Sequence, residues 1–381
     1  MNIEEKIELI KYVINPQNDP DNDRFAFNRI MNYYEVQCRR NAIGLSFPNR
    51  VLWKITGACN CKCEHCWANL GHTTPREKLL KLAKELSDNH VAMVSLSGGE
   101  PLLCKDLFDI YRILKTNNAI VEILTNGSLI TEEWIKQYKT VATPETDVIQ
   151  ISLDGPNSNI HDLQRNKPIF DKVIASIKML KEAGIKVRIS CTGTRLNQDY
   201  IHETFLLAQS LNVNVVSITP VFPLRNGKKE ELFLDEEIYL EQLLKCFRSK
   251  KNTDIRAQVP FGFQEMALEV AKTHRELLDI PDLSKKMLMQ ETNISMQIDA
   301  FGQALPGPEY EDVHASGNVY EEGIAAIWGK AKNWKEFRNL RDLSNTSCEK
   351  CEIYGICGGG NAKIAFDRYG TINAPDGRCY V

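Results

Sequence analysis

Seven of the twelve cysteines in this chain fall into two groups whose spacing suits metal binding. The first group consists of Cys59, Cys63 and Cys66. The second consists of Cys348, Cys351, Cys357 and Cys379. In a reducing compartment, clustered thiols bind metal or do chemistry more often than they form disulfides.

The first group has the spacing C-x3-C-x2-C on one short loop. Three thiolates can bind three corners of a cubane iron–sulfur cluster and leave the fourth iron open to an exogenous ligand. Zinc is the alternative, but zinc loops usually pair cysteines as C-x2-C, and a fourth ligand would have to come from far along the chain. The spacing therefore favours a catalytic cluster, with Cys61 as an extra thiol in the loop.

The second group supplies four thiolates with the spacing C-x2-C-x5-C and a more distant fourth cysteine. Four thiolates close a cubane with no open iron, which suits electron transfer or structure. A structural zinc on the same cysteines is the alternative. Gly358-Gly359-Gly360 would let the backbone wrap a bulky cluster.

A regular alternation of strands and helices positions the first group. The predicted strands are Val51–Thr56, Val91–Ser97, Val121–Leu124, Val148–Leu153, Lys186–Thr192 and Val213–Thr219. Helices are expected between them, one starting at a capping box in Thr74-Pro75-Arg76-Glu77. Near-continuous apolar strands are typical of a parallel sheet covered by helices. The predicted fold is α/β, a partial (β/α)6 TIM barrel with a small C-terminal iron–sulfur domain.

Polar loops follow four of these strands. They contain the first cysteine group, then Gly98-Gly99-Glu100-Pro101, then Thr125-Asn126, then Ser152-Leu153-Asp154. The carboxyl ends of parallel strands meet on one rim, where such sheets carry their functional sites. We therefore expect the four loops to form one site.

This combination resembles the radical S-adenosylmethionine (SAM) superfamily over residues 51 to about 222. In that family the open iron binds SAM, and an electron from the cluster cleaves it to methionine and a 5′-deoxyadenosyl radical that abstracts a substrate hydrogen. The resemblance implies SAM contacts from His65, Gly98, Gly99, Glu100, Pro101, Thr125, Asn126, Ser152, Asp154 and Arg165.

The resemblance also implies individual roles. His65 stands where the family has an aromatic residue near the adenine, and Gly98 to Pro101 would hold the methionine amino group. Ser152 and Asp154 would bind the ribose and nearby polar atoms, and Arg165 would pair with the methionine carboxylate. The alternatives are a surface loop histidine at 65, a simple turn at Thr125-Asn126, and an exposed helix-capping arginine at 165.

The second cysteine group resembles the SPASM domain, a C-terminal extension that carries auxiliary clusters. The cysteine positions of the first of its two clusters are missing here, while the set for the second is intact. We therefore predict two [4Fe–4S] clusters in all, one binding SAM and one auxiliary. The expected parts are an N-terminal helical extension (1–48), the barrel core (49–225), a helical bridging region (226–290) and the auxiliary cluster domain (291–381).

The bulk properties exclude several other classes. The formal net charge of −3 does not indicate a nucleic-acid-binding protein. The longest apolar runs have the length of strands and are too short to span a membrane. The N-terminus lacks the apolar core of a signal peptide, so a cytoplasmic protein is expected.

Only the family resemblance indicates a substrate. SPASM-type enzymes most often modify ribosomally made peptides. We expect a crosslink, thioether, epimerisation or oxidation on such a peptide, with a possible leader-binding protein and a flavodoxin- or ferredoxin-like electron donor. The alternatives are a small-molecule dehydrogenase or cofactor-biosynthesis enzyme and a non-enzymatic metal-binding scaffold. For an epimerisation, Cys191 on the fifth strand is one candidate hydrogen-atom donor.

Overall fold

A nine-stranded sheet forms the centre of the protein, in the order β7-β6-β5-β4-β3-β2-β1-β8-β9. The structure is a computed structural model that describes residues 1–14, 46–68, 70–222, 225–260, 262–274, 295–307, 317–330 and 341–379. The first six strands are β1 (Arg50–Lys54), β2 (Met93–Ser97), β3 (Ile120–Thr125), β4 (Val148–Ser152), β5 (Val187–Gly193) and β6 (Val215–Pro220). Each pairs in parallel with the next, as the sequence predicts.

The sheet is wider than the six predicted strands. β7 (Asp254–Ala257) extends it beyond β6, inside the segment expected to be helical. On the other edge, β8 (Ser295–Ile298) pairs in parallel with β1, and β9 (Ala304–Leu305) pairs antiparallel with β8. β8 lies within the expected auxiliary cluster domain (291–381), yet it is part of the barrel sheet.

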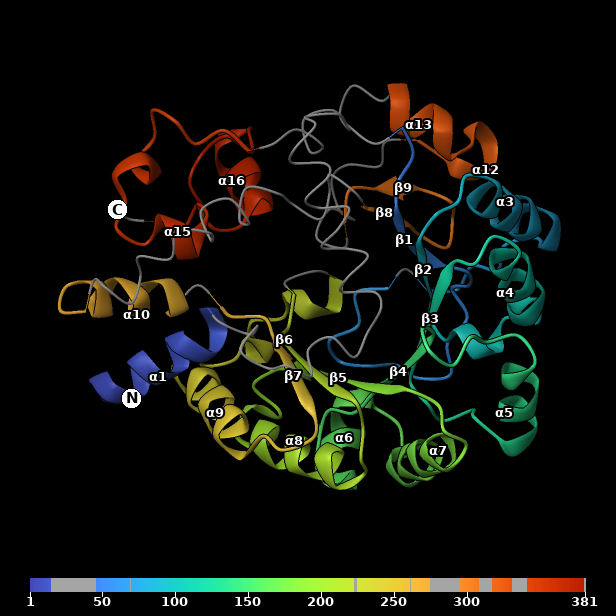
Figure 1. The fold of residues 1–381 in the computed structure, drawn as a ribbon, viewed down its shortest axis with the longest axis horizontal. Helices are drawn as coiled ribbons and strands as arrows, with labels where there is room; N and C mark the ends of the chain where they lie inside the picture. The colour runs from blue at the N-terminus through green and yellow to red at the C-terminus, as the bar shows by residue number, and fades with distance from the viewer. Residues whose placement is uncertain are drawn as a thin grey trace.

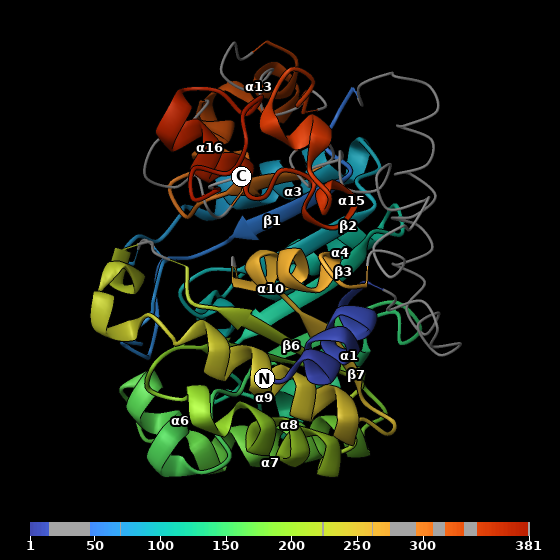
Figure 2. The same cartoon turned by 90° about the vertical axis from the view of Figure 1, so that its left-hand side faces the viewer.

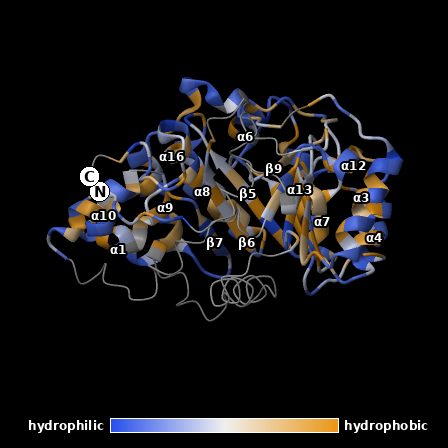
Figure 3. Ribbon diagram, turned by 90° about the horizontal axis from the view of Figure 1, so that it is seen from above, coloured by the Kyte–Doolittle hydropathy of each residue, from blue (hydrophilic) through white to orange (hydrophobic). Residues whose placement is uncertain are grey.

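Helices cover the outer face of the curved sheet (Figure 1). They are α3 (Arg76–Asp88), α4 (Leu107–Lys115), α5 (Glu132–Lys139), α6 (Ser158–Arg165), α7 (Phe170–Glu182), α8 (Ile201–Ser210) and α9 (Glu236–Ser249). Strand side chains alternate, so Val94 and Leu96 are fully buried on one face while Ser95 and Ser97 occupy the other. Figure 3 shows apolar central strands and more polar surrounding helices.

Two local expectations need correction. The stretch between β4 and β5, for which one helix is expected, contains two, α6 and α7, and Asn157 caps α6 by accepting a hydrogen bond from Ile160 N at 3.3 Å. Helix α3 has Pro75 as its N-cap and no side-chain cap. The hydroxyl of Thr74 instead donates to Ala300 O at 2.7 Å, so the predicted capping box was wrong.

The N-terminal helix α1 (Ile3–Ile14) packs against α9 and α10 (Gly262–Ala271). Leu9 and Ile10 are fully buried in this contact, and Glu8 pairs with Arg248 at 2.7 Å. The first 14 residues therefore cover helices beside the β7 edge, and residues 15–45 of the expected N-terminal helical extension lie outside the described residues.

The C-terminal part contains short helices away from α6, α7 and α8 (Figures 1 and 2). They are α12 (Val319–Glu322), α13 (Ile324–Lys330), α15 (Tyr354–Cys357) and α16 (Ala362–Tyr369). Single 3-10 turns are η3 (Pro101–Leu103), η4 (Gln198–Tyr200), η5 (Arg225–Lys228), η6 (Glu230–Leu232) and η10 (Ser347–Lys350). Within the described ranges, no helix has the length and apolarity needed to cross a membrane.

Candidate functional site

The first cysteine group lies on the loop that leaves the carboxyl end of β1. Cys59, Cys63 and Cys66 are free thiols, and Cys63 is buried. Hydrogen bonds from Cys61, including one from its backbone N–H 3.4 Å from the Cys59 sulfur, lower the pKa of the Cys59 thiol below its usual value. A lowered pKa favours the thiolate that binds iron.

The donor set is compatible with a cubane cluster. Among the residues that the structure describes, no three His, Cys, Asp or Glu side chains converge where one metal ion could sit. In a cubane each thiolate binds a different iron, so the sulfurs need not converge on one point. Three free thiols on one loop meet that requirement.

Gly98 and Gly99 let the loop after β2 lie directly against the cysteine loop. Gly99 N donates to Thr56 O at 2.8 Å, and Glu100 N donates to Ala58 O at 2.7 Å. A Cβ on Gly99 would come within 2.4 Å of Ala58 O and 2.8 Å of the Cys59 Cβ. Gly98 has a φ of +153° and equally little room. The two glycines are therefore needed for the shape of the cysteine loop.

Glu100 ties this glycine loop to the end of β3. Its fully buried carboxylate accepts hydrogen bonds from Thr125 Oγ1 at 2.6 Å, Asn126 N at 2.8 Å and Leu102 N at 3.1 Å. The last bond caps η3, which begins at Pro101. Burial raises the pKa of Glu100 to about 7, although these hydrogen bonds act to lower it. A ligand ammonium at this site would favour the ionised carboxylate.

Three polar residues that were not predicted from the sequence hold the cysteine loop. Asn60 Oδ1 accepts from Asn126 Nδ2 at 2.8 Å, and Asn60 Nδ2 donates to Ser128 Oγ at 3.0 Å. Lys167 Nζ donates to Asn60 O at 2.5 Å. The one available signal was Asn60 itself, a short amide between two ligand cysteines. Asn126 is thus part of the loop's support as well as a predicted SAM contact.

Asp154 and Arg165 form a buried ion pair behind Cys63. Arg165 Nη2 lies 2.5 Å from Asp154 Oδ2, and Arg165 Nη1 lies 3.7 Å from the Cys63 sulfur. Burial alone would raise the pKa of Asp154, but the Arg165 charge holds it below its usual value. The alternative of an exposed capping arginine is excluded, because Arg165 is only 8% exposed.

His65 is buried too, which excludes the alternative of a surface loop histidine. Burial, together with the charge of Arg165, lowers its pKa to about 4, so its imidazole is neutral. Its Nδ1 has no hydrogen-bond partner within the described part of the chain. A neutral ring with an unused polar atom suits a predicted role beside a nucleobase.

A row of hydroxyls lines the inner face of the barrel. Ser152, Ser190 and Ser217 occupy matching positions on β4, β5 and β6, and each is partly exposed. Their hydroxyls form no hydrogen bond with other described residues. Cys191 points the other way: it is 1% exposed and its thiol lies near Cys246 of α9. This orientation argues against Cys191 as a hydrogen-atom donor to a substrate in the barrel.

The second cysteine group surrounds one cavity. Cys348, Cys351, Cys357 and Cys379 all line it. Gln264, Glu265 and Leu268 of α10 line the same cavity. Four free thiols around one space fit the closed cubane predicted from the sequence.

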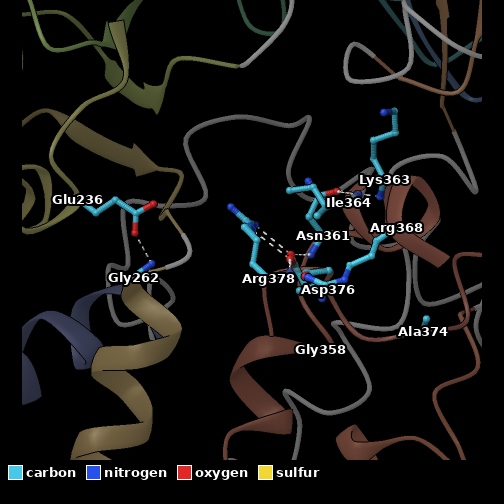
Figure 4. A network of polar contacts seen from close by, with 12 residues as sticks. Glu236, Gly262, Gly358, Asn361, Lys363, Ile364, Arg368, Ala374, Asp376 and Arg378 are labelled. Carbon is cyan, nitrogen blue, oxygen red and sulfur yellow. Dashed lines mark hydrogen bonds and ion pairs between the residues drawn. The ribbon is translucent and has the colours of Figure 1, made fainter. Parts of the chain in front are cut away.

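Two polar residues shape the chain around this cavity. Buried Arg341 donates to the carbonyls of Ile372 at 2.6 Å and Gly360 at 2.7 Å, and also to that of Ala374. Asp376 accepts from Asn361 N at 2.7 Å. Figure 4 shows Asn361 and Arg378 converging on the Asp376 carboxylate. The turns beside Cys357 and Cys379 are thereby joined.

Comparisons with protein families agree with the assignment of both cysteine groups to iron–sulfur clusters. Residues 53–208 match the radical SAM superfamily model, and residues 291–352 match the SPASM model, an iron–sulfur cluster-binding domain. The chain therefore contains a radical SAM domain and a SPASM domain. It is therefore a radical SAM enzyme whose two domains imply iron–sulfur clusters.

Similar curated proteins span most of the chain. An AdoMet-dependent heme synthase of Oleidesulfovibrio alaskensis is 26% identical, over 86% of this chain and 86% of its own. The mycofactocin maturase MftC of Mycolicibacterium smegmatis is 27% identical, over 88% of this chain and 83% of its own.

Among solved structures, Streptococcus suis SuiB bound to S-adenosylmethionine has a TM-score of 0.69 at 19% identity, covering 91% of this chain and 80% of its own. SuiB bound to precursor peptide SuiA has a TM-score of 0.68 at 18% identity, covering 93% of this chain and 81% of SuiB. These likenesses confirm the fold.

Proposed function

We propose that this radical SAM enzyme modifies a ribosomally synthesised peptide, with a single auxiliary [4Fe–4S] cluster on Cys348, Cys351, Cys357 and Cys379. The main support is similarity to a mycofactocin maturase across 88% of the chain, both domains included. When bound at the first cysteine group, a [4Fe–4S] cluster supplies the electron that cleaves SAM and so provides a hydrogen-abstracting radical. The remaining roles belong to side chains of the barrel.

The barrel residues would hold SAM on the rim and leave the inner face to the substrate. Gly98 and Gly99 keep backbone groups close to the cysteine loop, and buried Glu100 offers a carboxylate to an ammonium. The hydroxyls of Ser190 and Ser217 are uncommitted among the described residues, and a hydroxyl can both donate to and accept from a peptide backbone. This combination suits a polar, extended substrate.

A tetrapyrrole substrate is the second candidate, because a heme synthase matches equally well over a similar share of the chain. The two candidates differ in product. Anaerobically reconstituted enzyme should be incubated with SAM, a reductant and either a short peptide encoded beside the gene or iron coproporphyrin. A mass change in the peptide with 5′-deoxyadenosine release supports the proposal, and turnover of the porphyrin alone overturns it.

Two variants separate cluster chemistry from nonspecific thiol effects. Cys59→Ala should abolish 5′-deoxyadenosine formation because one ligand is lost. Cys104→Ala is the matched control, since Cys104 is a free, partly buried thiol outside both ligand sets. Retained 5′-deoxyadenosine formation in Cys59→Ala would contradict the assignment of the catalytic loop.

A further inference from the structure

Arg165 lies where α6 ends against the cysteine loop. Its guanidinium has one nitrogen 3.7 Å from the Cys63 sulfur and another 2.5 Å from the Asp154 carboxylate. Cys63 is buried as well. A cation buried beside a ligand thiol is a specific arrangement, because an arginine leaves water only when its charge and its donors are matched.

Asp154 holds the guanidinium in this orientation. Asp154 Oδ1 accepts a hydrogen bond from Thr192 N at 2.9 Å, and its backbone carbonyl accepts from Asn197 Nδ2 at 2.8 Å. Its backbone N–H donates to His161 Nδ1 at 3.1 Å. One bond thus holds the carboxylate and two hold the backbone of Asp154, and the guanidinium nitrogen that does not face the carboxylate is directed at sulfur.

The backbone around Arg165 adds to this constraint. Helix α6 ends directly after Arg165 at Asn166, which adopts a left-handed conformation with a φ of 50°. Lys167 then donates to Asn60 O on the cysteine loop. The segment is thus anchored to the loop on both sides of the helix end, so the contact between guanidinium and sulfur has little freedom to drift.

A hydrogen bond to a ligand sulfur stabilises the more electron-rich state of an iron–sulfur cluster. Such bonds, with charge and burial, set the reduction potential of these clusters. The charge of Arg165 acts in the same direction and is partly offset by Asp154, which faces a different guanidinium nitrogen, Nη2, from the one that faces Cys63, Nη1. Burial of both residues keeps water from screening these effects.

We propose that Arg165 raises the reduction potential of the cluster bound through Cys63 by donating an N–H···S hydrogen bond to the Cys63 sulfur from a position that Asp154 holds. The inference rests on the cluster assignment in the proposed function and not on the identity of the substrate. Arg165 is therefore a positioning residue, because it acts on the cluster through the ligand Cys63. It makes the one-electron reduction that starts SAM cleavage easier.

A redox titration followed by electron paramagnetic resonance tests this proposal without any turnover. The catalytic cluster is identified as the signal that changes when SAM is added, and its midpoint is then measured without SAM. In Arg165→Gln the equilibrium constant for reduction should fall about tenfold, equal to about 59 mV for one electron. Lys62→Gln is the matched control: it removes an exposed cation from the cysteine loop itself, where solvent screens its charge, so its midpoint should stay near that of the parent. An unchanged midpoint in an iron-replete Arg165→Gln protein overturns the proposal.

A second measurement uses the unaltered chain, in case Arg165→Gln does not hold iron. Protein labelled with ¹⁵N-arginine is reduced, and pulsed electron paramagnetic resonance is used to search for ¹⁵N coupled to the catalytic cluster. Coupling supports the proposal, and its absence overturns it. Failure of the proposed function would look different: the coupling and the midpoint shift would be present while no peptide is modified.

Discussion

The carboxylate of Glu100 accepts a 2.6 Å hydrogen bond from the hydroxyl of Thr125, joining the glycine loop after β2 to the end of β3. The two residues lie 25 positions apart in the chain, yet both are buried beside the cysteine loop. A carboxylate in this position is expected to show in the pH dependence of stability.

Glu100→Gln should remove part of that dependence. Burial raises the Glu100 pKa from 4.5 to about 7, so between these values the folded protein holds a proton that the unfolded chain has lost. The free energy of unfolding should therefore fall as pH rises across this window, by on the order of 3 kcal/mol. Denaturant unfolding of cluster-free protein at pH 5 and pH 8 measures the difference. The exposed substitution Glu77→Gln should keep the parent's slope, and an unchanged slope in Glu100→Gln would refute the assignment.

Gly99→Ala should displace the cysteine loop. The added Cβ would meet Ala58 O at 2.4 Å and the Cys59 Cβ at 2.8 Å, so the ligand loop must move. Iron analysis should show loss of about half the iron, the share of one of two equal clusters, with the auxiliary signal retained. Gly329→Ala in α13 is the control, because its added Cβ would meet nothing within 4 Å. Full iron content in Gly99→Ala would show that the loop tolerates the shift.

Arg341→Met should destabilise residues 341–379 around the second cysteine group. It leaves buried carbonyls near Cys357 without their donor, which costs about 3 kcal/mol locally. Hydrogen exchange should increase over residues 341–379 and the auxiliary cluster should be lost, while the barrel keeps its protection. Arg112→Met, at an exposed pair with Asp109, should change neither, since such pairs contribute little.

Cys191→Ala should affect stability and not hydrogen transfer. The thiol packs on the outer face of β5, so its loss leaves a small cavity costing about 1 kcal/mol. If the enzyme epimerises its peptide, deuterium from solvent should still enter the product in this variant. Loss of deuterium incorporation with a normal unfolding midpoint would restore Cys191 as a candidate donor.

Motif spacing and strand periodicity predict the barrel core and both cysteine groups, because these are local patterns. The rim residues could be grouped from sequence since the carboxyl ends of parallel strands meet. What was missed depends on contacts distant in sequence. Thr74 matches a capping box, but its hydroxyl donates to Ala300, 226 residues later. A short edge strand such as β7 depends on pairing with β6 and has little pattern of its own.

Arg165 illustrates the same limit at the site. Its sequence neighbours do not reveal whether it faces solvent, a ligand or a sulfur, because its partners Asp154 and Cys63 come from other elements. Helix α6, by contrast, had a local signal in its asparagine cap, which the sequence analysis did not use.

Because β8 pairs with β1, the radical SAM and SPASM segments share one sheet and have no boundary at which the chain can be divided without breaking strand pairing. Val51 and Met296 are register partners, so a chain cut ahead of β8 would bare the backbone of the very strand that delivers Cys59. Swapping the C-terminal half between related enzymes would therefore require the donor's β8 to match the recipient's β1. A chimeric enzyme should therefore be joined after β9 and not at residue 291, where the match to the SPASM model begins.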